Sequence, residues 1–402
     1  MAELLQRVRL DWGQTGSLRW ALLDWHLLFA VLAVAGLGLV MVGSASVSIA
    51  EGVTGNPFFY LNRQAAFMAV ALLAGVVVLH VSLDQFYRAG PVLLVLGFLL
   101  LVAVLIPGVG REVNGATRWI PLGVINLQVA EVARICFIIY LAGYCVRRYA
   151  ELPNTNGAFA IPLAVFSFAA FLLLAQPDFG TALVLMVTAL AVLFLAGASL
   201  WRIAVLGLML AGAAWLLIVG SPYRWQRLTT FTDPWADPFN AGFQLTQSLI
   251  AIGRGEWFGV GLGSSVQKLF YLPEAHTDFL FAVLAEELGL LGVVAVVALF
   301  AYIVWRGLHI GLASLRAGRP FGGYLAWGLT ISIGLQAFIN MAVTMGLLPT
   351  KGLTLPLMSY GGSSLIMTCI ALALILRVDY ECRLAALNPP RPRKRPSGRA
   401  RP

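Results

Sequence analysis

Long apolar segments recur along almost the whole chain and limit what it can fold into. Of its 402 residues, 60% are hydrophobic and 11% are charged, and its mean hydropathy is +0.86. A run of about 18 or more apolar residues can cross the hydrocarbon core of a bilayer as an α-helix. Such runs follow one another here, with proline and glycine at the joins. The sequence therefore predicts an all-α polytopic membrane protein and excludes an ordinary soluble domain.

The hydropathy pattern predicts about ten transmembrane helices. Their expected spans are 24–46, 62–81, 90–106, 126–146, 159–175, 179–196, 199–219, 277–305, 323–346 and 362–381. We expect three regions: a cytoplasmic segment 1–23, a membrane domain 24–381 that includes one large outer loop 220–276, and a basic disordered cytoplasmic tail 382–402. The first apolar run also resembles part of a signal peptide, but its length and the similar runs after it favour an uncleaved span.

The distribution of basic residues predicts the orientation of the chain. About two thirds of the 27 Lys and Arg residues fall in the segments that share a side with the N-terminus, or in the tail. The positive-inside rule therefore places both termini in the cytoplasm and the large loop on the periplasmic side of the inner membrane. Because the excess charge serves topology, we expect no nucleic-acid partner, and we expect the basic tail to contact anionic membrane lipids.

The stretch Leu272–Gly289, LPEAHTDFLFAVLAEELG, places acidic residues where a long polar loop enters a long apolar helix. A carboxylate at the centre of a bilayer costs at least ~2.5–3.5 kcal/mol and therefore indicates a functional site. Asp278 lies at the edge of the apolar run, where water and a membrane-bound substrate can both reach it. Glu286 and Glu287 follow inside the run, about two helical turns further on. We therefore expect Asp278 to carry the chemistry.

Three basic residues are candidates for binding an anionic lipid headgroup on the outer side. Arg118 stands beside Trp119 in an outer loop and suits bidentate phosphate binding, although such a pair also serves as an interfacial anchor. Arg63 has two equally weighted interpretations, a ligand contact or a side chain that reaches up to the headgroups. Lys351 lies in an irregular, Pro- and Gly-rich segment, which is tolerated at membrane level only when it is buried or lines a cavity. We expect Lys351 to face the same outer cavity as Asp278.

Three further charged residues have both a structural and a functional interpretation. Glu131 and Arg134 are three positions apart on one helix and can neutralise each other, or they can turn a polar face to a substrate cavity. Asp178 is expected to cap the helix that follows it, with a role as a second acidic group in the outer cleft as the alternative.

The large outer loop is rich in Trp, Tyr, Pro and Arg, a composition typical of an interfacial platform or a partner site. Its segment Gly259–Ser265 resembles a phosphate cradle. That segment lacks the strand–turn–helix context of a nucleotide site, so we interpret it as a tight backbone turn. The four cysteines lie in or beside predicted helices, and we expect neither disulfides nor a metal cluster.

Taken together, a carboxylate and several cations on the outer side suit the transfer of a group away from a lipid pyrophosphate. A carboxylate can act as a general base toward an acceptor hydroxyl. Fixed cations stabilise the charge that develops on the departing pyrophosphate. The same charges also fit a lipid transporter, which keeps ionised groups at membrane depth.

Four motifs in the sequence resemble the SEDS family of bacterial wall-building proteins. They are LPEAHTDFLFAVLAEELG, GLLPTKGLTLPLMSYGGSS, NGATRWIPLG and AQPDFGTALVL. The similarity extends over about residues 24–380, and the run PTKGLTLPLMSYGGSS is most similar to the cell-division branch of the family. The resemblance implies a ten-helix peptidoglycan glycosyltransferase that polymerises lipid II at the division septum.

The resemblance also implies roles for individual residues. Asp278 would activate the 4-hydroxyl of the acceptor N-acetylglucosamine, which would attack C1 of the donor N-acetylmuramic acid and expel undecaprenyl pyrophosphate. Glu131 and Arg134 match an E-x-x-K motif of the family, with Arg in place of Lys, and Gln128-Val129 replaces the usual Gln-Pro. The candidate substrate-binding residues are Arg63, Arg118, Glu131, Arg134, Lys351, Ser359, Glu274 and His276.

The family further implies partners, and it leaves two other functions open. A class B penicillin-binding transpeptidase would dock through membrane helices and the outer loop, within a complex of other division proteins. A divalent cation, Mg²⁺ or Mn²⁺, is compatible with the pyrophosphate, although the sequence has no dedicated metal cage. The alternatives are a lipid II flippase and a non-catalytic scaffold that recruits the transpeptidase. The embedded acid favours an enzyme over a scaffold, and the clustering of charges on the outer side favours polymerisation over flipping.

Overall fold

The computed structural model describes residues 19–113, 115–121, 123, 126–240, 242–269, 271–349 and 352–387. Most of the predicted N-terminal segment, Lys351 and the basic tail from residue 388 onward lie outside these residues. In the described part, eight helices are long and apolar enough to cross a membrane, and two shorter apolar helices accompany them. These ten helices correspond one to one with the predicted spans, so the expected polytopic α-helical fold is confirmed.

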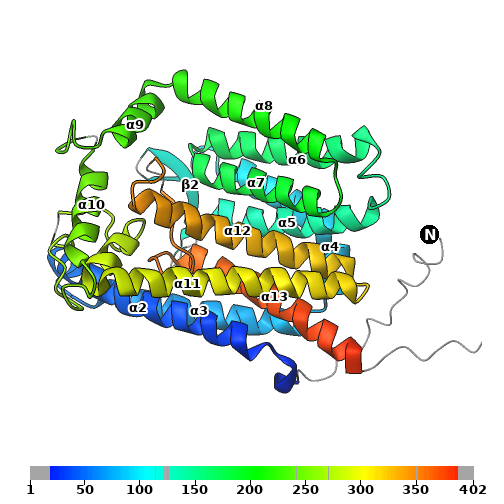
Figure 1. The fold of residues 1–402 in the computed structure, drawn as a ribbon, viewed down its shortest axis with the longest axis horizontal. Helices are drawn as coiled ribbons and strands as arrows, with labels where there is room; N and C mark the ends of the chain where they lie inside the picture. Colours follow the sequence, from blue (N-terminus) through cyan, green and yellow to red (C-terminus); the bar gives the residue numbers. More distant parts are fainter. Residues whose placement is uncertain are drawn as a thin grey trace, which may run out of the picture.

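The helices form an elongated bundle, and two further short helices lie at one of its ends (Figure 1). The bounds are η1 Trp20–Leu22, α2 Trp25–Thr54, α3 Phe59–His80, α4 Leu83–Ala103, α5 Val129–Arg147, α6 Asn156–Ala175, α7 Phe179–Leu195, α8 Leu200–Val219, α9 Pro222–Thr232, α10 Phe243–Gly255, α11 Leu280–Arg316, α12 Pro320–Thr344 and α13 Gly362–Leu387.

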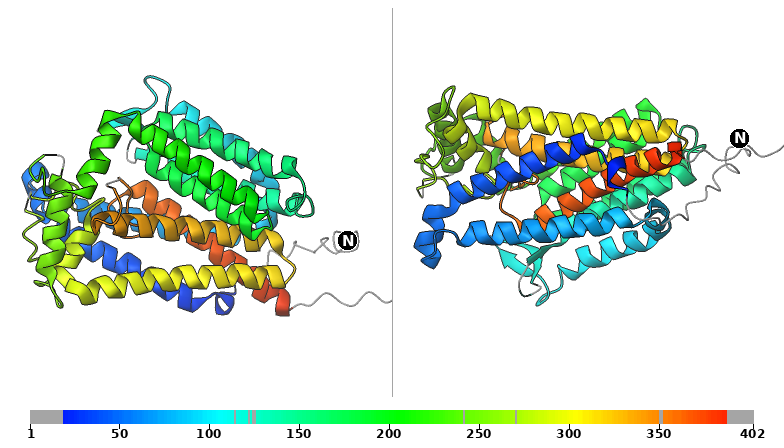
Figure 2. Two further views of the ribbon diagram at one scale, coloured as in Figure 1. Left: turned by 45° about the horizontal axis from the view of Figure 1, so that its top comes forward. Right: turned by 90° about the horizontal axis from the view of Figure 1, so that it is seen from below.

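Figure 1 places α9 and α10 at one end of the bundle, and η1 and the last turns of α13 at the opposite end. We call the first the loop end and the second the terminal end. Figure 2 shows α3 running beside α13, a pairing that brings the second and the last of the ten long helices together. One apolar core joins all ten of them, because each contributes buried side chains to the same cluster.

Several helices are longer than their apolar runs predicted. α2 continues to Thr54 and ends where Gly55 adopts a left-handed conformation (φ 70°). α4 begins at Leu83 rather than near residue 90, because Ser82 and Gln85 form a capping box ahead of the apolar run. α11 extends to Arg316. Hydropathy therefore located the parts that cross the membrane, whereas local capping determined where the helices begin and end.

A small antiparallel sheet interrupts the helical fold and was not predicted. Its strands are β1 Arg111–Val113, β2 Ala116–Pro121 and β3 Asn126–Gln128, in the order β1-β2-β3. The fourth long helix, α5, begins at Val129, three residues after the approximate start expected at 126, because residues 126–128 pair with β2. The sheet leads directly into α5 and holds the segment that carries Arg118.

α11 is broken at Gly289, which has a backbone conformation (φ 65°, ψ −165°) accessible essentially only to glycine. The loop after α10 fills the break with backbone hydrogen bonds. The N–H of Val260 donates to the carbonyl of Glu286 (2.9 Å), and the N–H of Leu290 donates to the carbonyl of Glu256 (2.9 Å). The glycine-rich segment after residue 258 thus makes a close backbone contact with α11, as expected for a tight backbone turn.

We expect Gly289→Ala to destabilise the protein strongly. A Cβ atom at this position would lie 2.3 Å from the backbone nitrogen of Gly259 and 2.7 Å from the carbonyl oxygen of Gly255, and neither atom can rotate away. The strained backbone alone costs about 1–3 kcal/mol, and the clash adds to it. Thermal unfolding in detergent measures the effect. The control is Gly212→Ala in α8, where nothing lies within 4 Å of the new atom and stability should not fall. Equal unfolding temperatures for the two variants would contradict the expectation.

The segment between α12 and α13 returns into the bundle without helical structure over residues 352–361. It packs so closely on α2 that a Cβ at Gly38 would lie 2.5 Å from the Cα of Met358. Leu355, Leu357 and Met358 are buried in the core. The described part of this predicted irregular segment is therefore enclosed by protein, as expected for non-helical backbone at membrane level.

Candidate functional site

Asp278 lies in a tight turn immediately before α11. The backbone carbonyl of Glu274 accepts hydrogen bonds from the N–H groups of Thr277 (3.1 Å) and Phe279 (3.2 Å). The Glu274 carboxylate accepts from the hydroxyl of Thr277 (2.5 Å), and Glu274 has a positive φ of 58° that suits the turn. The turn sets Asp278 at the N-terminal end of the helix, where the helix dipole favours a negative charge.

Two polar residues of α12 fix the surroundings of this turn. The side-chain amide of Asn340 donates to the carbonyl of Asp278 (2.8 Å) and to that of Leu353 (2.5 Å). Gln336 donates to the carbonyl of Thr354 (3.1 Å). A buried helix thereby joins the Asp278 turn to the irregular segment before α13. These two polar residues of a mostly apolar helix thus have a defined structural role.

The irregular segment reaches the carboxylate itself. A Cβ built on Gly352 would lie 3.0 Å from Oδ2 of Asp278, so the backbone of residue 352 lies against that oxygen. Lys351 precedes Gly352 in the sequence but is outside the described residues. Its expected position facing Asp278 therefore stays a prediction.

The pKa of Asp278 is raised from its ordinary value near 3.8 to about 7. Burial is the main cause, and the negative charges of Glu274 and Asp178 add to it. Arg118 and Arg227 act in the opposite direction. A carboxyl group with a pKa near neutrality can accept a proton at physiological pH and is therefore suited to general base catalysis. Arg227 of α9 was not a predicted site residue, because no sequence spacing links it to Asp278.

Arg118 projects from β2 toward the turn between α6 and α7. Its Nε donates to the carbonyl of Gln176 (3.2 Å), and a second guanidinium nitrogen donates to the carbonyl of Pro177. These bonds fix the guanidinium close enough to Asp278 to influence its pKa. The predicted cap by Asp178 is confirmed, because its carboxylate accepts from the backbone N–H of Thr181 (3.2 Å).

His276 lies in an aromatic cluster next to Asp278. Its ring centroid is 4.7 Å from that of Tyr60 and 5.6 Å from that of Tyr360. The backbone carbonyl of His276 accepts from the N–H of Tyr360 (2.9 Å). Burial lowers the pKa of His276, which favours the neutral form of its ring. Its Nδ1 is buried and has no hydrogen-bond partner among the described residues, which leaves it one polar atom for a ligand.

Arg63 and Ser359 lie near this aromatic cluster. The guanidinium carbon of Arg63 is 5.5 Å from the ring centroid of Phe59 and 5.6 Å from that of Phe67. Ser359 is buried, and its hydroxyl accepts from the backbone N–H of Leu355 (2.9 Å), so it shapes the irregular segment. Substrate binding by Arg63 and by Ser359 remains a prediction.

Glu131 and Arg134 form a buried ion pair with an N–O distance of 2.5 Å. Both side chains are almost fully buried, and Arg134 also donates to the side-chain oxygen of Gln336. The predicted self-neutralising pair is thus confirmed. Gln336 in turn donates to the carbonyl of Thr354, so the ion pair is linked through Gln336 to the irregular segment.

Within the described residues, no group of three or more His, Cys, Asp or Glu side chains could hold a metal ion. We therefore assign no residue to a metal. The structure brings together the acid Asp278, whose pKa is raised, and two basic residues, Arg118 and Arg227, whose charges act on it. An aromatic cluster around His276, whose Nδ1 has no partner among the described residues, lies beside them. The predicted residues Glu274, His276, Asp278 and Arg118 converge, and sequence analysis missed Tyr60, Arg227 and Tyr360.

The fold and this site define a polytopic membrane protein with an embedded acid at the loop end. A family model described as "Cell cycle protein" (FtsW, RodA, SpoVE) matches residues 25–384, and the chain belongs to this family. A protein of Alkalilimnicola ehrlichii, named "Probable peptidoglycan glycosyltransferase FtsW", is 85% identical over 402 residues. The match covers 100% of this chain and 100% of that protein. A protein of Halorhodospira halophila with the same name is 61% identical over 373 residues, which cover 93% of this chain and 94% of that protein.

Solved structures show the same fold. A chain from a study described as "Structural coordination of polymerization and crosslinking by a peptidoglycan synthase complex" is 33% identical, with a TM-score of 0.73. The match covers 90% of this chain and 99% of that one. The rod shape determining protein RodA of Thermus thermophilus is 30% identical with a TM-score of 0.67, over 90% of this chain and 97% of its own. The resemblance found in the sequence motifs is thereby confirmed.

Proposed function

We propose that this chain polymerises lipid II into glycan strands at the outer face of the cytoplasmic membrane during cell division, with Asp278 as the general base. The class of activity is that of a peptidoglycan glycosyltransferase, the name given to relatives that are 85% and 61% identical to it. The substrate, the side of the membrane on which the reaction takes place and the role of each residue are our proposal. The observation that carries it is the buried Asp278 carboxyl group, whose pKa is raised to about 7 and on which the charges of Arg118 and Arg227 act.

In the proposed reaction, the Asp278 carboxylate removes the proton from the 4-hydroxyl of the acceptor N-acetylglucosamine. The acceptor oxygen then forms a bond to C1 of the donor N-acetylmuramic acid, and the bond from C1 to the pyrophosphate oxygen breaks. Undecaprenyl pyrophosphate leaves with the electron pair. A single displacement inverts the α-linked donor into a β-1,4 linkage and needs no covalent intermediate.

The cations near Asp278 are assigned to the pyrophosphate. Arg118 is fixed by two carbonyl groups and needs no rearrangement when charge develops on the leaving group. Arg227 projects from α9 and adds a second positive charge. Lys351 is proposed as a third, by its place in the sequence beside Gly352. Arg63, Glu274 and His276 are proposed to position the sugars, the last through its free Nδ1.

We place α9, α10 and the rest of the loop end on the periplasmic side and both termini in the cytoplasm. The described beginning and end of the chain lie together at the terminal end, as an even number of spans requires (Figure 1). A class B penicillin-binding transpeptidase is the proposed partner at the loop end. Exposed aromatic side chains there, Trp225, Trp235 and Phe239, support a docking surface outside the bundle.

We expect the polymerisation rate to fall as the pH drops below about 7. The folded-state pKa of Asp278 is raised to about 7, so its carboxyl group takes up a proton as the pH falls through that value and the base is lost. Below this pH the rate should fall about tenfold per unit, and above pH 8 it should be constant. The measurement is the initial rate of polymer formation from labelled lipid II by the purified full-length protein with its transpeptidase. A rate that is flat from pH 5 to 8 would contradict the assignment, and lipid II that crosses vesicles without polymerising would indicate transport.

A further inference from the structure

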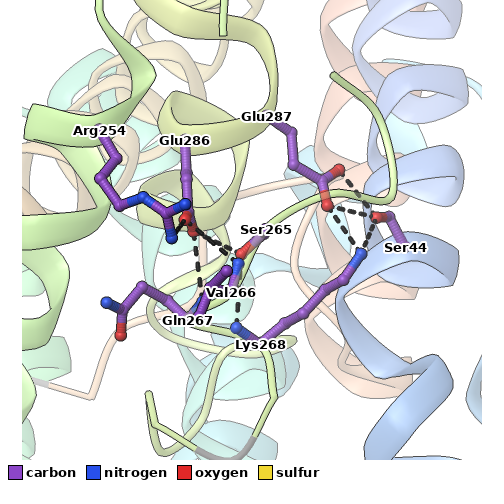
Figure 3. A network of polar contacts seen from close by, with 8 residues as sticks. All are labelled: Ser44, Arg254, Ser265, Val266, Gln267, Lys268, Glu286 and Glu287. Atoms are coloured by element: carbon purple, nitrogen blue, oxygen red, sulfur yellow. Dashed lines mark hydrogen bonds and ion pairs between the residues drawn. The ribbon is translucent and has the colours of Figure 1, made fainter. Parts of the chain in front are cut away.

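Glu286 and Glu287 form a buried polar network beside the break in α11 (Figure 3). The Glu286 carboxylate accepts from Arg254 of α10 (3.1 Å) and from the hydroxyl of Ser265 (2.5 Å). It also accepts from the backbone N–H groups of residues 266 and 267. Both glutamates are almost fully buried. We call the set Ser44, Arg254, Ser265, Lys268, Glu286 and Glu287 the glutamate network.

Glu287 makes the second half of the network. Its carboxylate accepts from Nζ of Lys268 (2.9 Å) and from the hydroxyl of Ser44 on α2 (2.7 Å), and Lys268 also donates to that hydroxyl (3.1 Å). Lys268 is only 6% exposed, so this is a buried ion pair whose partners come from the loop and from α11. Apolar residues of similar volume are often at least as stabilising as such a pair, so stability alone does not explain its presence.

The network anchors one end of the segment that carries Asp278, and the start of α11 holds the other end. The chain is bound to α11 at residues 265–268, leaves it, and rejoins it at Leu280, only a few residues before Glu286. Glu274, His276 and Asp278 all lie in this short excursion. The position of the acid relative to the bundle therefore depends on an anchor on one side and on a helix start on the other.

From this geometry we infer that the Lys268–Glu287 pair is a positioning element of the active site, which holds the Asp278 segment in register with α2 and α11. The inference rests on the proposed role of Asp278 as the base. Neither partner touches the reacting groups, so the pair acts through the segment between them. A displacement of about 1 Å at the reacting atoms can cost roughly 10²-fold in rate, which is how a distant anchor affects catalysis.

The test separates positioning from stability. Lys268→Met leaves Glu287 without its cation, and the double variant Lys268→Met with Glu287→Gln removes both charges. We expect the double variant to recover most of the thermal stability lost in the single one, because no unpaired charge is left buried. Its kcat for lipid II polymerisation should nevertheless stay roughly 10- to 100-fold below wild type, with KM within about twofold, because the bond from Lys268 to Glu287 is still missing. Lys268→Arg keeps the charge and should keep kcat within about fivefold.

Three further variants complete the design. Ser44→Ala removes a partner that Lys268 and Glu287 share without burying an unpaired charge, and should lower kcat by about threefold. Arg148→Met breaks an exposed ion pair with Glu151 elsewhere in the chain and should leave kcat unchanged. Native kcat in the double variant, or in a folded Ser44→Ala protein when the double variant does not fold, would overturn the inference. Asp278→Asn is run beside them: activity in that variant would refute the proposed base, whereas its loss together with native kcat in the network variants would refute only the positioning.

Discussion

Asp278→Asn should remove polymerisation of lipid II almost completely while the protein still folds. Asparagine keeps the shape of the side chain but cannot accept the proton, and a positioned general base contributes typically ~10²–10⁴-fold to a rate. Folding should be preserved because the turn is held by the backbone of Glu274 and by the Asn340 amide, neither of which bonds to the Asp278 carboxylate. The measurement is the initial rate of polymer formation from labelled lipid II, with thermal unfolding recorded on the same preparation.

The matched control for that variant is Asp84→Asn. Asp84 lies in the first turn of α4, at the terminal end, where it pairs with Arg88, and it is not one of the charged groups that shift the pKa of Asp278. Asp84→Asn also replaces one carboxylate by an amide, and this variant should polymerise lipid II at the native rate. If Asp278→Asn also polymerised at the native rate, Asp278 would not be the base, and the acid at the loop end would need another explanation.

The second large effect is expected from Arg134→Met. This change leaves the Glu131 carboxylate buried without its cation, and removing one partner of a buried pair typically costs about 3–5 kcal/mol. Gln336 also loses a partner, and Gln336 holds the irregular segment through Thr354. The free energy of unfolding in a mild detergent should fall accordingly, and polymerisation should fall with it.

A double variant tests the cause of that loss. Arg134→Met combined with Glu131→Gln removes both charges and should be more stable than Arg134→Met alone. Arg88→Met, which breaks an ion pair whose Arg side chain is largely exposed, should change the free energy of unfolding by less than about 1 kcal/mol. A double variant no more stable than the single one would show that the unpaired carboxylate is not the source of the effect.

The sequence was sufficient to predict the ten long helices because each must be apolar over the thickness of a bilayer, whatever packs beside it. It was not sufficient for their ends. α2 and α11 run on into polar residues, and the start of α4 depends on a capping box. The sheet was missed for a related reason: strands of three to six residues carry little periodic signal, and their pairing is not local.

The candidate site was predictable where it is local. The spacing of Glu274, His276 and Asp278 in one turn, the cap by Asp178, and the pairing of Glu131 with Arg134 each follow from a separation of two to four residues. Contacts between distant segments did not follow. Arg227 of α9 and Tyr360 reach the Asp278 region only because the bundle brings separate loops together. Gln336 and Asn340 stand out as polar residues in the mostly apolar α12, but the sequence does not say which backbone carbonyls they bind.

The break at Gly289 has a consequence for how the protein is made. The loop that bonds to Glu286 and Leu290 leaves the ribosome before α11 does, and it stays without these partners until that helix has been synthesised. In hydrocarbon, α11 satisfies its own backbone only as a continuous helix. Gly289 can therefore break the helix only once the loop after α10 lies against it and supplies the missing hydrogen-bond partners.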